Sequence, residues 1–145
     1  MIDIQALDRD LIQIIEKRNE LSQLDYSAEH YDTLEETIHA LEDDFLSAYG
    51  EYIEDGISEV YEEFHLPSEV LSPLSYLARF YHKMDETETG PTFNVTSKDG
   101  LPIEIPGHED KDTRLVILPN PTRLFLILKG KGKEVWRAGQ EQKTA

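Results

Sequence analysis

The stretch from Ser27 to His65 reads SAEHYDTLEETIHALEDDFLSAYGEYIEDGISEVYEEFH, and it decides the fold. Apolar or aromatic residues recur in it at alternating spacings of three and four, which is the stripe of an amphipathic helix. The stripe consists of Tyr31, Leu34, Ile38, Leu41, Phe45, Ala48 or Tyr49, Tyr52, Ile53, Ile57, Val60 or Tyr61, and Phe64. As one helix the stretch would be about 57 Å long at about 1.5 Å per residue. We therefore expect other elements to lie along it.

Two glycines, Gly50 and Gly56, interrupt this stretch and leave two arrangements open. Each destabilises a helix interior by about 1 kcal/mol relative to alanine, so the stretch could form two hinged helices. The apolar stripe nevertheless keeps its phase through Tyr52 and Ile53, and no proline intervenes. We therefore predict one continuous or bent helix. It should end at Leu66-Pro67, because the residue before a proline avoids the helical conformation.

A shorter helix is predicted from about Asp3 to Leu24, with the Asp3 carboxylate as its N-cap. The connection to the long helix is short, so the two should form an antiparallel hairpin. Ser27 is the expected N-cap of the long helix, and Tyr26 and Tyr31 fall at the two positions of a hydrophobic staple.

A third helix is predicted to begin at Ser72-Pro73, with serine as N-cap and proline at the first helical position. Its apolar residues continue to Met84. Residues 85–92 are polar and contain the pair Gly90-Pro91, which is typical of a linker.

Residues 93–137 switch to strand patterns. Segments 93–96 and 101–105 alternate apolar and polar residues on either side of the Lys98-Asp99-Gly100 turn, which predicts a hairpin. Segments 115–118 and 124–128 are apolar on both faces, which predicts central strands covered on both sides. A lysine-rich turn then leads to a last strand at 134–137.

Together these patterns predict an α+β fold in which a long helical hairpin and a third helix precede a C-terminal antiparallel meander of four or five strands. We expect one domain over 1–145, with a helical half at 1–84, a linker at 85–92, a β half at 93–137 and a loose tail at 138–145. The helices can cover only one apolar face of the sheet. A second copy of the chain, or curling of the sheet on itself, would cover the other, and we therefore predict a homodimer.

The charge is unevenly distributed along the chain. Residues 1–90 hold 23 acidic and 5 basic side chains, whereas residues 91–145 hold 7 acidic and 9 basic ones. Such a field repels nucleic acid and anionic membranes from the helical half and attracts basic partners. The chain has no cysteine, which excludes disulfides, thiolate zinc sites and thiol nucleophiles. It shows neither a secretion signal nor a membrane-spanning run, so we expect a cytoplasmic protein.

Two Glu-x-x-His pairs are the most specific candidate site. Glu36 and His39 lie one helical turn apart, and Glu62 and His65 repeat the spacing. This spacing lets a carboxylate and an imidazole reach one metal ion from one helix face, as in carboxylate-bridged di-iron bundles. In a straight helix the two pairs would lie about 39 Å apart by the helical rise. A shared metal site therefore requires a sharp reversal between Gly50 and Gly56.

Three further patterns have simpler structural explanations. The loop His108-Glu109-Asp110-Lys111-Asp112 lacks the spacing of a calcium loop. The turn Lys129-Gly130-Lys131-Gly132-Lys133 could cradle a phosphate, but it lacks the P-loop pattern, and lysines also protect sheet edges from aggregation. The tyrosines near the long stripe are expected to pack at the boundary between core and solvent.

The leading functional hypothesis is a non-catalytic, oligomerising interaction module, such as an adaptor, inhibitor or chaperone-like protein, whose acidic face engages a basic partner. One alternative is a metal-dependent enzyme that uses Glu36, His39, Glu62 and His65. Another is a small-ligand binding module with its pocket between the tyrosine-bearing helices and the sheet. No organic cofactor is predicted.

Overall fold

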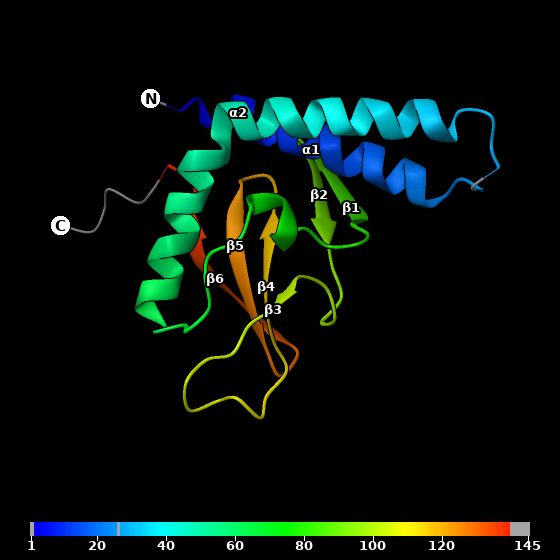
Figure 1. Cartoon of the computed structure of the whole chain (residues 1–145). Coiled ribbons are helices and arrows are strands. Elements are labelled where there is room, and N and C mark those ends of the chain that lie inside the picture. The colour runs from blue at the N-terminus through cyan, green and yellow to red at the C-terminus, as the bar shows by residue number, and fades with distance from the viewer. Residues whose placement is uncertain (1, 26, 140–145) are drawn as a thin grey trace.

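The computed structural model describes residues 2–25 and 27–139, and Figure 1 shows their arrangement. Two α-helices precede two antiparallel sheets, which confirms the α+β class. The elements are α1 (Ile4–Ser22), α2 (Tyr31–Glu63), the 3₁₀ turn η1 (Pro73–Tyr76), β1 (His82–Thr87), β2 (Gly90–Asn94), β3 (Leu101–Pro102), β4 (Thr113–Leu118), β5 (Arg123–Leu128) and β6 (Lys131–Arg137). Strands β1 and β2 form one sheet, and the other has the order β3-β4-β5-β6.

Helix α1 begins as its sequence predicts. The Asp3 carboxylate accepts hydrogen bonds from the backbone N–H groups of Gln5 (3.1 Å) and Ala6 (3.2 Å), which confirms the N-cap. The predicted N-cap of the second helix at Ser27 is wrong, because α2 begins at Tyr31 after His30, whose side chain makes no capping bond. Ser27 instead bonds to Asp25 within the loop. The staple with Tyr26 lies outside the described residues.

Helices α1 and α2 form the predicted antiparallel hairpin. Arg18, late in α1, pairs with Glu42 of α2 at 3.1 Å, whereas Asp10, nearer the start of α1, accepts a 2.8 Å bond from Tyr49 further along α2. Residues late in α1 therefore contact residues early in α2, and the two helices run antiparallel. The side of α1 that faces the core carries Leu7, Leu11, Ile14 and Ile15, all of them buried.

Helix α2 is continuous from Tyr31 to Glu63 but changes direction along its length (Figure 1). Its partner changes as well. Tyr49 still bonds to α1, whereas Tyr52 stacks edge-on against Trp136 of β6 with ring centroids 5.7 Å apart. The buried Gly50 lies between these two residues. We call residues 31–49 the first arm and residues 51–63 the second arm, and the prediction of one bent helix is confirmed.

The two glycines of α2 have different roles. A Cβ at Gly50 would meet only Leu46 at ordinary contact distances of 3.6 and 3.7 Å, whereas a Cβ at Gly56 would lie 2.4 Å from Cε2 of Trp136. Gly56 is therefore required by the approach of the helix to the indole ring.

This difference predicts opposite effects of two alanine substitutions. Gly50→Ala should raise the free energy of unfolding by up to about 1 kcal/mol through helix propensity. Gly56→Ala should lower it by about 1–3 kcal/mol, because overpacking outweighs the same propensity gain. Urea denaturation of the two variants and the wild type measures both effects. Equal shifts in the same direction would contradict the assigned contact.

The predicted third helix is wrong. Only one 3₁₀ turn, Pro73–Tyr76, forms after Ser72, and Leu77 is already extended. Tertiary hydrogen bonds explain the extension, because the amide of Asn19 on α1 donates to the Tyr81 carbonyl at 2.8 Å and accepts from its N–H at 3.1 Å. The Tyr81 hydroxyl donates to the Ile117 carbonyl of β4 at 2.7 Å. These bonds hold the backbone in a conformation that a helix would not allow.

The predicted linker and first hairpin also differ from the structure. Residues 85–92 belong to β1, β2 and the turn between them, and β2 pairs with β1 rather than with residues 101–105. The turn is fixed from a distance, since the Asn120 amide donates to the carbonyls of Gly90 and Pro91 at 3.1 Å each. Strand β3 pairs instead with β4.

Strands β4 and β5 confirm the predicted central pair. Leu115 pairs with Leu126 and Ile117 with Leu124, and these residues face the helices. On the opposite face, Gly100 lies against Val116, and residues 94–97 line a small pocket together with Leu118 and Ile127. Val116, Leu118 and Ile127 are at most 5% exposed. The apolar face that motivated a homodimer is therefore not open, and the dimer stays a prediction.

Helix α1 also holds the β4–β5 turn. One carboxylate oxygen of Asp8 accepts bonds from both the backbone N–H and the hydroxyl of Thr122, each at 2.6 Å. Thr122 is 1% exposed, and its carbonyl accepts from the Ala138 N–H at 2.9 Å. Ala138 belongs to the stretch predicted to be a loose tail, yet it is buried; residues 140–145 lie outside the described part.

We predict that Asp8→Ala lowers the free energy of unfolding by about 2–3 kcal/mol, because it leaves two buried donors of Thr122 without a charged acceptor. Glu16→Ala, an exposed change on the same helix, is the control and should shift stability by less than about 0.5 kcal/mol. Thermal denaturation compares them. Indistinguishable melting curves would show that the Asp8–Thr122 contact does not contribute.

Candidate functional site

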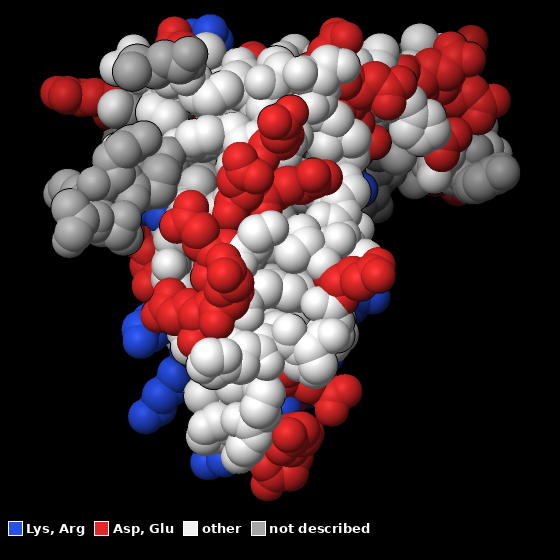
Figure 2. All heavy atoms as spheres, turned by 60° about the vertical axis from the view of Figure 1, so that its left-hand side comes forward, with Lys and Arg blue, Asp and Glu red and all other residues white. Residues whose placement is uncertain are grey.

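The most distinctive surface lies on helix α2. Between Tyr31 and Glu63 the helix carries 12 acidic residues and no lysine or arginine. On the second arm these residues form one exposed band opposite the buried Ile53, Ile57 and Val60, and Figure 2 shows a continuous acidic band on this side of the molecule. We call the band the acidic face; it comprises Glu51, Glu54, Asp55, Glu59, Glu62 and Glu63.

The acidic face opposes the stability of its own helix. Asp55 stands four residues from both Glu51 and Glu59, and like charges at this spacing destabilise a helix by about 0.2–0.5 kcal/mol per pair. Glu62 and Glu63 lie at the helix C-terminus, where the helix dipole disfavours negative charge. The last turn holds no basic residue. Fold stability alone therefore does not account for this composition.

The four predicted metal ligands do not lie together at one site. Glu36 and His39 are exposed on the first arm, whereas Glu62 and His65 are exposed at the end of the second arm, where the ribbon has turned away (Figure 1). His65 follows the helix with a φ of 56°. Residues 2–25 and 27–139 contain no group of three or more His, Asp or Glu side chains that could hold a metal ion. The observed bend does not supply the reversal that a shared site requires.

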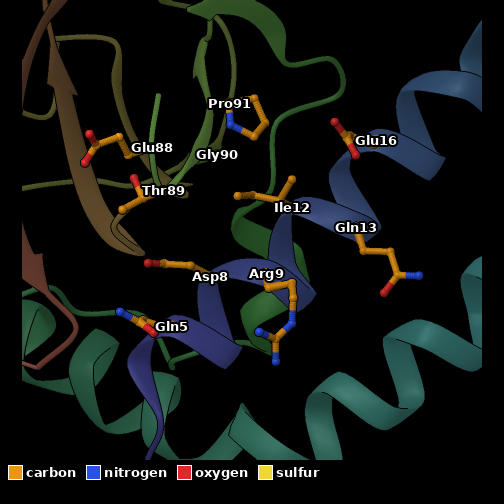
Figure 3. A pocket seen from close by; sticks show the side chains of 10 residues that line it. All are labelled: Gln5, Asp8, Arg9, Ile12, Gln13, Glu16, Glu88, Thr89, Gly90 and Pro91. Atoms are coloured by element: carbon orange, nitrogen blue, oxygen red, sulfur yellow. The ribbon is translucent and has the colours of Figure 1, made fainter. Parts of the chain in front are cut away.

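A cleft of about 680 Å³ lies between α1 and the β1–β2 turn. Figure 3 shows that its side chains diverge: Asp8 points toward the strands, Arg9 away from Glu88, and Gln13 outward along α1. Asp8 is already engaged by Thr122. The lining contains neither a histidine nor a serine, so it lacks the serine–histidine pair of a serine hydrolase.

The tyrosines of α2 confirm the packing interpretation. Tyr49 donates to Asp10, Tyr61 and Tyr76 share a 2.7 Å bond between their hydroxyls, and Tyr52 accepts from the Gly139 N–H at 2.8 Å. Burial raises the pKa of Tyr49 to about 12, helped by the bond to Asp10. Burial and the bond to Tyr76 raise the pKa of Tyr61 further. These hydroxyls are internal donors and acceptors rather than the lining of a ligand pocket.

The raised tyrosine pKa values predict a loss of stability in alkaline solution. Burial also raises the pKa of Tyr81, which joins Tyr49 and Tyr61. Each ordinarily ionises at 10.0, so above that pH the unfolded chain releases protons that the folded chain retains. Their contribution to stability is complete below pH 10 and decreases as the pH rises toward the folded-state pKa values.

Absorbance of tyrosinate during alkaline titration measures this behaviour. Tyr49, Tyr61 and Tyr81 should ionise well above pH 10, because burial raises the pKa of each, and the Tyr61→Phe variant should lose part of that late transition. One transition near pH 10 for all tyrosines, with the helical circular dichroism intact, would contradict the assigned burial.

Two carboxylates of the loop 108–112, those of Glu109 and Asp112, bond to neighbouring residues. Asp112 accepts from Arg114 Nε at 3.0 Å and from Lys98 Nζ at 3.1 Å. These two hydrogen bonds hold the pKa of Asp112 below its usual range. The Glu109 carboxylate accepts from the Gly107 N–H at 3.1 Å. The ion pairs of Asp112 thus tie this loop to Lys98 and to Arg114 of β4.

Sequence reasoning found the charge of the acidic face but not its shape. The spacing of Glu51, Asp55, Glu59 and Glu62 identifies one helix side, whereas the bend depends on contacts with distant strands.

In the described ranges, no helix is both long enough and apolar enough to cross a membrane. No protein-family model, curated protein or solved structure matches this chain.

Proposed function

We propose that this chain is a non-catalytic protein-interaction module whose acidic face binds a basic surface on a partner protein, in the manner of an adaptor, an inhibitor or a chaperone-like protein. The observation that carries the proposal is a 33-residue helix with 12 acidic residues and no basic one. The proposal includes a cytoplasmic location and a homodimer, both expected from the sequence.

The anchoring of the second arm favours recognition over mere solubility. Ile53, Ile57 and Val60 are at most 1% exposed, so the sheet holds the helix from behind. The acidic side chains therefore project from a fixed backbone, and a preorganised surface loses less entropy on binding than a flexible tail. An acidic stretch needed only for solubility would require no such support.

The charge also indicates the class of partner. With a formal net charge of −16, the chain repels nucleic acid and anionic lipid and attracts a lysine- or arginine-rich protein surface. Such attraction mainly raises the association rate and weakens with salt, because the Debye length is about 10 Å at 0.1 M ionic strength.

The test compares two variants with equal changes in charge. Glu51→Gln/Asp55→Asn/Glu62→Gln alters the acidic face, and Glu36→Gln/Asp43→Asn/Asp44→Asn alters the first arm. Each immobilised protein is exposed to lysate of the source cells at low salt, and retained proteins are identified by mass spectrometry. We expect the wild type and the first-arm variant to retain the same basic protein, and the acidic-face variant to lose it.

The acidic-face variant should also be at least as stable as the wild type, since it relieves like-charge repulsion. Lost retention then reports lost recognition rather than unfolding. Equal retention by all three proteins, or no salt-sensitive retention by the wild type, would refute the proposal.

A further inference from the structure

A groove opens where α2 ends above the sheet. Helix α2 stops at Glu63, and the next residue, Phe64, lines the groove together with residues of β5 and β6. Phe64, Ile105, Leu126 and Leu128 form the apolar floor of this groove, which has a volume of about 450 Å³. A volume of this size lies within the range of small-molecule sites.

Three lysines, from β6 and the turn before it, line the groove beside the apolar floor. Lys131 pairs with Leu128 and Lys133 with Leu126, so both lysines stand on the same side of the sheet as the floor, and Lys129 begins the adjoining turn. The lining contains no acidic residue. In the described part of the chain these three lysines make no ion pair. In a protein of net charge −16 the groove is therefore a local site of opposite sign.

The backbone conformation of the β5–β6 turn is unfavourable for a lysine at position 129 and lowers the stability of the fold. Lys129 has a φ of 54° and Gly130 a φ of 79°, which are the two positive values of a two-residue hairpin turn. Glycine or asparagine adopts this conformation more readily than lysine does. Turn formation alone would therefore favour another residue at position 129.

We infer that the groove binds a monomeric long-chain carboxylate, with its alkyl chain on Phe64, Leu126 and Leu128 and its carboxylate on the lysines. The apolar floor disfavours a free phosphate, which has nothing to bury there. The lysines favour an anionic head over a neutral one. This inference is independent of the acidic face.

Isothermal titration of the full chain with decanoate tests the inference. The wild type should bind one equivalent saturably. Butyrate, which has the head without the long chain, and 1-decanol, which has the chain without the charge, should each bind at least about tenfold more weakly.

Matched variants assign the site. Lys131→Glu/Lys133→Glu should weaken decanoate binding at least about tenfold. Lys17→Glu/Lys83→Glu, with the same change in net charge at two lysines outside the lining of the groove, should bind as the wild type does. Leu128→Gln, a change at the partly exposed floor, should weaken binding with Lys129, Lys131 and Lys133 intact. Circular dichroism confirms that each variant is folded.

Three outcomes would overturn the inference: no saturable decanoate binding, equal binding of 1-decanol, or equal binding by the two lysine variants. Light scattering on the same samples measures the oligomeric state and so tests whether a second copy of the chain occupies the groove. A dimer that only Lys131→Glu/Lys133→Glu abolishes, with no decanoate bound, would show that the groove holds the acidic face of a second copy instead.

Discussion

The contact between Gly56 and the Trp136 ring is the constraint on which the rest of the structure depends. Because a Cβ at position 56 would lie 2.4 Å from the indole, only glycine lets the second arm approach β6 this closely. The approach buries Ile53, Ile57 and Val60. At about 1.5–3 kcal/mol per buried side chain, their burial exceeds the roughly 1 kcal/mol that glycine costs a helix. The packing of α2 on the sheet thus outweighs its local helix propensity.

This packing divides the surface of α2 into two sides with different roles. One side closes the core over β4 and β5, while the other carries the exposed acidic side chains of the acidic face. The acidic face and the lysine-lined groove both follow from where the second arm lies and where it ends. Glu63 closes the helix, and Phe64 immediately begins the floor of the groove. One element therefore positions two surfaces of opposite charge.

The parts that the sequence predicted are those whose signals are local. The apolar runs at 115–118 and 124–128 identified the central strands, the Asp3 cap marked the start of α1, and the unbroken stripe indicated a single α2. An apolar stripe or run shows which residues are buried, whichever element of the fold covers them. It can therefore be recognised without knowing the tertiary structure.

The parts that it missed depend on distant residues. Strand β1 is exposed along all six residues, so it has no alternation to detect. The extended backbone at Tyr81 is held by Asn19, and the Thr122 turn by Asp8, 114 residues away. The lysine turn was visible in the sequence. The apolar floor beside it combines Phe64, which follows α2, with Ile105 of the loop after β3 and with Leu126 and Leu128 of β5.

The bend of α2 is the central claim, and a distance across it tests that claim most directly. The chain has no cysteine, so His39→Cys and Glu62→Cys would place two spin labels on exposed positions without interference. In a straight helix the 23 intervening steps would separate the labelled backbones by about 35 Å. Pulsed electron paramagnetic resonance should give a distribution centred clearly below that value. A distribution centred at or above about 35 Å would show a straight helix and contradict the account.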